Sequence, residues 1–187
     1  MTRQKPRAAR LFSYVVDHDL GFAPNPYSGY CTPVLCKFGG NGGRRNIVEL
    51  ADVGDWIVGT GGQNEDSAGN GRLIYLMRVD EKLQFRRFLA DRRFHGRSDC
   101  KDFGSGNTFA LISQRYFYFG RNALRVSTLP KQLAGNLEKK GPVFRRDYPS
   151  DRLRELAKWF ARNHKIGMRG DPCGQAPRKA ALEPDLC

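Results

Sequence analysis

The sequence predicts an α+β fold, in which a compact mixed sheet has flanking helices. Segments typical of strands and of helices follow one another without the regular alternation of a βαβ protein, and this order favours α+β. The chain has 187 residues, of which 40% are hydrophobic and 11% aromatic. That size and composition are typical of one globular domain with a sizeable core. We expect this domain to span residues 11–175, with a flexible basic tail over 1–10 and a loose C-terminal tail over 176–187.

The first half of the chain contains three segments with the composition of strands. Leu11–Val16 and Arg72–Val79 are rich in β-branched and large apolar residues, and Trp56–Gly59 follows a Gly-Asp turn. Between the first two predicted strands, Arg44–Val53 fits a short helix with its apolar residues on one side. The polar, glycine-rich segment 61–71 predicts a loop.

The second half contains two predicted helices and a strand pair. Lys82–Phe94 fits a helix because its large apolar residues are spaced three and four apart. Phe109–Phe119 predicts a strand, a bend and a second strand. A further helix begins near Ser150, a plausible N-cap, and has an apolar stripe of Leu153, Leu156, Ala157 and Phe160. This order of elements is similar to that of small PUA-like barrels that read modified bases, so a barrel is one form the sheet could take.

The most distinctive segment is the proline- and glycine-rich loop Gly21–Lys37. Pro24 and Pro26 stiffen it, because proline has a fixed φ and restricts the residue before it. The loop also contains amide, phenol, thiol and ammonium groups, and loops of this kind often carry function. The alternative is a structural connection whose cysteines pack as small apolar residues. As a ligand pocket, the loop would use Asn25, Tyr27, Cys31, Cys36 and Lys37.

Three acidic residues lie at the ends of predicted strands. Asp17 and Asp19 follow the first strand, and Asp55 precedes Trp56. Carboxylates in such places can hold a base edge, act as a general base or bind Mg²⁺. For Asp55 we favour the alternative that it caps the Gly54 turn, whereas Asp17 ends a buried strand beside the stiff loop. The predicted ligand site therefore also includes Asp17, Asp55 and Trp56.

Several blocks of the chain together resemble the nucleotide-modification-associated domain 2 family. The resemblance covers roughly residues 11–175, and its first blocks are the longest and most specific. The blocks are Tyr14-Val15-Val16 with Gly21-Phe22-Ala23-Pro24-Asn25-Pro26, Cys31-Thr32, Cys36-Lys37, Gly54-Asp55-Trp56-Ile57-Val58-Gly59, Leu111-Ile112-Ser113, Phe117-Tyr118-Phe119-Gly120, and Gly167 with Gly170-Asp171-Pro172.

The resemblance implies a pathway. The family is found in bacteria and phages and is linked to DNA base modification mainly by its gene neighbourhoods, so proteins of such a pathway are expected partners. This chain departs from the family pattern at one turn: where a Gly-Asp-Asn type turn is expected, it has Ser98-Asp99-Cys100-Lys101.

The cysteines allow three interpretations. Cys31 and Cys36 could supply two zinc ligands, with His95, Cys100 or Cys173 completing the set, but there is no second closely spaced pair. A cysteine nucleophile needs a base and a positive surrounding, and no recognisable catalytic motif provides them. We therefore expect reduced, metal-free cysteines that act as packing or pocket residues.

The charge of the chain favours a polyanionic partner. Lys and Arg number 32 against 19 Asp and Glu, a net charge of +13, which indicates nucleic acid or a nucleotide. The glycine clusters at 39–43 and 59–62 offer backbone donors to a phosphate, although neither matches an ATP or NAD fingerprint, and we expect no cofactor. The predicted nucleic-acid contacts are Arg44, Arg45, Arg86, Arg87, Arg92 and Arg93.

Compartment and function follow from these observations. Five cysteines in a chain of this size do not form a disulfide framework, and the apolar run Leu11–Val16 is too short for a signal peptide or a membrane span. We expect a cytoplasmic protein.

We favour a DNA-modification protein that binds a modified nucleotide or modified DNA, with Trp56 or Tyr27 stacking on the base. The alternatives are an enzyme of the same pathway, acting through Cys31, Cys36 or an Asp, and a non-enzymatic host-interaction protein.

Overall fold

The computed structural model describes residues 7–34, 46–99 and 108–174. Its main sheet has the strand order β8-β1-β2-β3-β6-β9, and β7 also pairs with β3. A separate two-stranded sheet joins β4 and β5. The strands are β1 Leu11–Val16, β2 Trp56–Gly61, β3 Arg72–Arg78, β4 Glu81–Gln84, β5 Phe109–Ile112, β6 Tyr116–Tyr118, β7 Leu124–Arg125, β8 Phe144–Arg145 and β9 Gly167–Met168.

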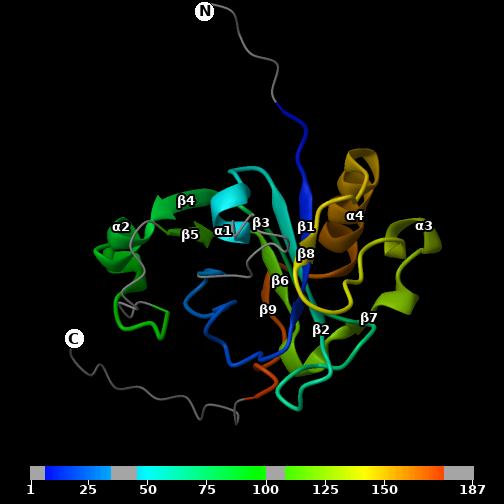
Figure 1. The fold of residues 1–187 in the computed structure, drawn as a ribbon, viewed down its shortest axis with the longest axis horizontal. Helices are drawn as coiled ribbons and strands as arrows, with labels where there is room; N and C mark the ends of the chain where they lie inside the picture. The colour runs from blue at the N-terminus through cyan, green and yellow to red at the C-terminus, as the bar shows by residue number, and fades with distance from the viewer. Residues whose placement is uncertain (1–6, 35–45, 100–107, 175–187) are drawn as a thin grey trace, which may run out of the picture.

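The helices flank these sheets. Figure 1 shows α3 and α4 on one side of the main sheet, while α2, β4 and β5 extend from the other side. The α-helices are α1 Ile47–Leu50, α2 Phe85–Leu89, α3 Lys131–Ala134 and α4 Ser150–Asn163, and short 3₁₀ helices span Arg92–Phe94, Gly120–Asn122 and Val126–Thr128. In the part of the chain that the structure describes, no helix has both the length and the apolar character needed to cross a membrane.

The adjacent strands β1 and β2 are parallel and buried on both faces. β1 pairs with β2 from Leu11 opposite Trp56 to Val16 opposite Gly61, and every residue of both strands is buried. Strand side chains alternate between faces, so Phe12 and Ile57 enter one hydrophobic core, whereas Leu11 and Trp56 enter the other. Cover on both faces explains why these strands are mostly apolar. The polar exceptions Ser13 and Thr60 are buried and donate hydrogen bonds to backbone carbonyls.

The α+β class is confirmed, but a PUA-like barrel is not. The described strands form an open sheet in which β8 and β9 are the edges. Mixed pairing is present as expected: β1 and β2 are parallel, and β2, β3 and β6 are antiparallel neighbours.

The predicted helix Lys82–Phe94 is wrong. Its first part forms strand β4, which pairs with β5 from Glu81 opposite Ile112 to Gln84 opposite Phe109. Only Phe85–Leu89 is α-helical, and Arg92–Phe94 forms a 3₁₀ turn after Asp91, whose side chain accepts a hydrogen bond from the Arg93 amide. The spacing of the aromatic residues does indicate a shared buried face, because Phe85, Phe88 and Phe94 lie in one hydrophobic cluster. Pairing with β5, a strand from later in the chain, makes the first residues of the predicted helix a strand.

Other predicted elements differ only at their ends. β1 has the predicted bounds, β2 continues to Gly61, and β3 ends one residue early at Arg78. In α4, Ser150 is the first helical residue and Pro149 is the N-cap. The apolar stripe of α4 packs on the sheet, with Leu153, Leu156 and Phe160 buried.

Candidate functional site

The proline-rich loop folds into a narrow hairpin. Asn25 and Thr32 exchange backbone hydrogen bonds of 3.0 Å in each direction, and the chain turns at Ser28 and Gly29, both with positive φ. Asn25 is buried, and its side-chain amide forms hydrogen bonds within and next to the loop. Its Oδ1 accepts from the backbone N–H of Tyr27 at 3.2 Å, and its Nδ2 donates to the Ser98 hydroxyl at 3.2 Å.

A buried ion pair holds this hairpin. The Arg97 side chain donates to the Asn25 carbonyl at 3.0 Å, to the Tyr27 carbonyl and to Thr32 Oγ1 at 2.7 Å. Its partner Asp99 is 3.1 Å away, is fully buried, and also accepts from Thr32. Burial of the pair is compensated because the guanidinium and the carboxylate have several hydrogen bonds each. Ser98 and Asp99, the described residues of the turn at which this chain departs from the expected family pattern, thus help to anchor the loop.

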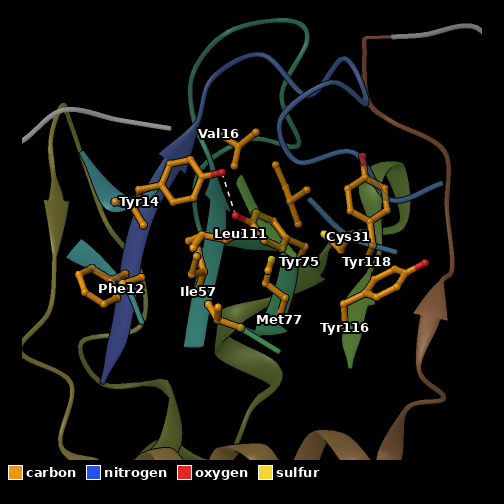
Figure 2. Close-up of a cluster of buried hydrophobic side chains, with 14 of the residues drawn as sticks. Phe12, Tyr14, Val16, Cys31, Ile57, Tyr75, Met77, Leu111, Tyr116 and Tyr118 are labelled. Carbon is orange, nitrogen blue, oxygen red and sulfur yellow. Dashed lines mark hydrogen bonds between the residues drawn. The ribbon is translucent and has the colours of Figure 1, made fainter. Parts of the chain in front are cut away.

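Cys31 lies below the loop, in the core. It is fully buried and its backbone pairs with Ser113. Figure 2 shows its side chain near Tyr116 and Tyr118, and shows Tyr14 and Tyr75 with their hydroxyls joined at 2.9 Å. Cys31 therefore has the surroundings of a packing residue.

A second buried polar cluster joins the start of the loop to the C-terminal segment. Asp19 is fully buried; it accepts from the Tyr118 hydroxyl at 2.5 Å and from the Cys173 amide at 3.1 Å. Burial raises the pKa of the Asp19 carboxyl. Burial and the neighbouring Asp19 also raise the pKa of the Cys173 thiol to about 12. A thiol that stays protonated at neutral pH is a poor nucleophile.

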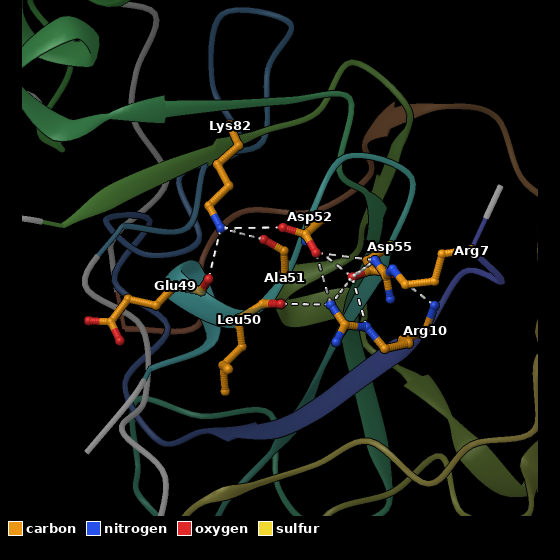
Figure 3. A network of polar contacts seen from close by, with 8 residues as sticks. All are labelled: Arg7, Arg10, Glu49, Leu50, Ala51, Asp52, Asp55 and Lys82. Atoms are coloured by element: carbon orange, nitrogen blue, oxygen red, sulfur yellow. Dashed lines mark hydrogen bonds and ion pairs between the residues drawn. The ribbon is translucent and has the colours of Figure 1, made fainter. Parts of the chain in front are cut away.

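Asp55 is the centre of a network that joins the N-terminal segment to the sheet. The fully buried carboxylate accepts from Arg7 at 2.9 Å and from Arg10 at 2.7 Å, and also from the Asp52 amide at 3.1 Å (Figure 3). Burial opposes ionisation, but the hydrogen bonds from Arg10 and Arg7 outweigh it and lower the Asp55 pKa. Asp55 thus accepts a hydrogen bond within its own turn, from the Asp52 amide, which agrees with the capping role favoured from the sequence. It also binds Arg7 and Arg10, which belong to the segment that was expected to be a flexible tail.

Asp17 lines a polar hollow where β1 and β2 end. The hollow encloses about 350 Å³, and its wall includes Gly62, Gln63, Asn70 and Lys140. A Cβ at Gly62 would be 1.9 Å from Asp17 Oδ1, so the Asp17 side chain would have to move to admit any other residue here. Asp17 and Trp56 lie at opposite ends of the paired strands.

Trp56 lies in a different depression, which we call the Trp56 groove. It runs between the N-terminal segment, the start of β2 and α4, and it encloses about 520 Å³. The wall is largely apolar, Trp56 is 7% exposed, and two cations complete the rim. The lining residues are Ala8, Ala9, Trp56, Ser150, Leu153, Arg154, Ala157 and Lys158.

The same two cations also line a neighbouring depression, the Trp159 hollow. It lies on the other side of the polar face of α4, against α3, and encloses about 450 Å³. Its lining residues are Pro130, Gln132, Leu133, Asp151, Arg152, Arg154, Glu155, Lys158, Trp159, Arg162 and Asn163. Lys158 pairs with Glu155 at 3.0 Å.

The arginines predicted to contact nucleic acid have mixed surroundings. Arg86, Arg87 and Arg92 are exposed, whereas Arg93 is held by Asp91 at 2.6 Å and by Glu81 at 2.9 Å. Arg44 and Arg45 lie outside the described residues, as do Cys36 and Lys37.

The predicted ligand-binding residues are therefore divided among several places. Asn25, Tyr27 and Cys31 share the loop and the core below it, Asp17 lines the polar hollow, and Trp56 lines the groove beside α4. Sequence reasoning missed Arg97, Asp99 and the cations of α4. Arg154, Lys158 and Arg162 recur every fourth residue, a pattern that could have identified a basic stripe. Among the described residues, no three His, Cys, Asp or Glu side chains gather as metal ligands would.

One comparison with known proteins identifies the chain's family. The family model described as nucleotide modification associated domain 2 matches residues 8–102, half of the chain. The chain therefore belongs to this family. The match includes the Trp56 side of the groove and the anchored loop, and it ends before α4. Neither the curated proteins nor the solved structures compared with the chain give a match.

Proposed function

We propose that this member of the nucleotide-modification-associated domain 2 family binds a modified nucleotide or modified DNA, and that the Trp56 groove holds the base and its phosphate. Family membership associates the chain with nucleotide modification. We infer binding rather than catalysis from the state of the described thiols, and we infer the use of this groove from the residues that line it.

One observation carries the proposal: the groove combines an apolar wall with two cations at its rim. Its volume of about 520 Å³ lies within the range of small-molecule sites, roughly 300–1,000 Å³. A base has apolar faces and would lie against Trp56, Leu153 and Ala157, while Arg154 and Lys158 would pair with the phosphate. The net charge of +13 favours the approach of such an anion.

The chemistry of the described thiols favours binding over cysteine catalysis. Cys31 is fully buried, and the pKa of Cys173 is raised, whereas a nucleophile needs an accessible thiolate. Binding requires only apolar contact, charge pairing and hydrogen bonding, which the groove offers. Asp17, Asn25 and Tyr27 stay predictions. The groove proposal places the phosphate contact at α4 instead of at the exposed Arg86, Arg87 and Arg92, and the control below tests that choice.

The test is equilibrium binding of deoxycytidine monophosphate and its 5-hydroxymethyl form at low salt. Arg154→Ala/Lys158→Ala should weaken binding at least about tenfold, because charge-assisted hydrogen bonds contribute about 1.5–3 kcal/mol each. The matched control is Arg86→Ala/Arg87→Ala, which removes the same charge from the other side of the molecule and should leave binding nearly unchanged. Equal weakening by both double variants would reject the groove. The absence of binding of either nucleotide, both as the free monophosphate and within a DNA strand, would reject the proposed function.

A further inference from the structure

We infer that the ligand is single-stranded nucleic acid, with one base in the Trp56 groove and the next in the Trp159 hollow across the basic face of α4. This inference rests on the proposed function and extends it from one nucleotide to a strand. It concerns residues of α4, which lie beyond the region that the family model matches.

The two depressions adjoin each other on the surface of α4. Arg154 and Lys158 line both of them, so a ligand that leaves one depression along these side chains enters the other. Each depression also contains one of the two tryptophans of the chain. Trp159 is partly exposed, and it is held edge-on by Phe160 and His164 at ring-centre distances of 5.2 and 5.4 Å. Two aromatic sites on either side of a cationic ridge are typical of surfaces that bind single strands.

The charges along the helix fit a phosphate backbone. Arg154, Lys158 and Arg162 are exposed and recur every four residues, about 6 Å apart along the axis. Arg154, Arg162 and the neighbouring Arg152 form no ion pair with any described residue. Two carboxylates, Asp151 and Glu155, also line the Trp159 hollow, and they reduce its positive charge without reversing it.

The shape of the site favours a single strand over a duplex. Bases inside a duplex are stacked on one another and present only their edges, whereas a single strand can turn successive bases outward. Each depression here encloses several hundred cubic ångströms, which is enough for an unstacked base, a group that a duplex does not present. A free nucleotide would fill one depression and leave the second without a role.

Three probes distinguish these ligands: a labelled ten-nucleotide DNA strand of mixed sequence, the same strand annealed to its complement, and a deoxynucleoside monophosphate. Fluorescence anisotropy at 50 mM salt reports the first two, and competition with the labelled strand reports the third. We expect the single strand to bind at least tenfold more tightly than the duplex. Trp159→Ala should weaken single-strand binding at least about fivefold and leave mononucleotide binding within twofold.

Trp159→Ala could weaken binding by disturbing the fold, so a second variant at an exposed residue accompanies it. Arg162→Ala removes an exposed cation that has no ion pair with any described residue, and it should weaken only strand binding. Its matched control is Arg125→Ala, an exposed arginine on β7 that lines neither depression. If the mononucleotide binds but the duplex binds as tightly as the single strand, or if Arg162→Ala has no effect, the two-base site is rejected and the groove remains. If no probe binds, the proposed function itself is rejected.

Discussion

At the scale of residues, two buried aspartates have opposite electrostatic roles. Asp55 accepts hydrogen bonds from two arginines, so its charged form is stabilised and its pKa is lowered. Asp19 is surrounded by a phenol, a thiol and a backbone amide, so burial dominates and its pKa is raised. The first ties the N-terminal segment to the sheet, and the second ties the C-terminal segment to the loop.

Replacing Asp55 should cost stability mainly at neutral pH. A lowered folded pKa means that the carboxylate stabilises the protein above its unfolded value of about 3.9, and that this contribution is lost as the pH falls through the folded value. We expect Asp55→Asn to lower the free energy of unfolding by about 1.5–3 kcal/mol at pH 7. Urea unfolding at pH 7 and pH 3.5 tests this prediction, and a cost that does not shrink at pH 3.5 would contradict it.

Replacing Asp19 should show the opposite pH dependence. A raised folded pKa means that the folded state binds the proton more tightly, so Asp19 loses its stabilising contribution as the pH rises from about 3.9 to the folded value. Asn cannot titrate, and Asp19→Asn should therefore cost more stability at pH 4 than at pH 8. The check is chemical denaturation of both proteins at the two pH values; a larger cost at pH 8 would show that the ionised carboxylate is the stabilising form.

At the scale of elements, α4 has one face for the core and another for a ligand. Leu153, Leu156 and Phe160 pack on the sheet, while the cations on the polar face line the two depressions. Two acidic residues, Asp151 and Glu155, also lie on the ligand side, and Glu155 pairs with Lys158.

Removing this acidic group should strengthen binding. Glu155→Gln frees Lys158 and removes repulsion toward a phosphate, an effect of up to about 1 kcal/mol, or roughly fivefold in affinity at low salt. Because exposed ion pairs contribute little, the melting temperature should change little. Single-strand affinity of this variant is compared with that of Glu65→Gln, an exposed carboxylate outside both depressions. Equal gains in the two variants would indicate a general charge effect.

The same elements show what the sequence predicts and what it does not. β1 and α4 are correctly predicted because their patterns are local: a short apolar run and a 3.6-residue apolar stripe. Glu81–Gln84 is wrongly predicted as helix because its structure depends on β5, which follows about 25 residues later. The Trp56 groove has a similar origin, since residues 8–9, 56 and 150–158 meet only in the fold. Trp56 could be named from the sequence, but its cationic neighbours could not be assigned to it.

At the scale of the whole molecule, the net charge of +13 and the position of α4 act together. The overall charge attracts a polyanion, and the row of cations on α4 would decide where it binds. Such binding must depend steeply on salt, because each neutralised phosphate releases a counterion.

The central claim is tested most directly by the salt dependence of single-strand binding between 50 and 200 mM salt. If Arg152, Arg154, Lys158 and Arg162 each neutralise one phosphate, the slope of log affinity against log salt should be about −3. Arg154→Ala/Lys158→Ala should reduce that slope to about half, whereas Arg86→Ala/Arg87→Ala should leave it unchanged. A slope that falls equally in both double variants, or the absence of binding at 50 mM salt, would contradict the claim that α4 and the Trp56 groove form the nucleic-acid site.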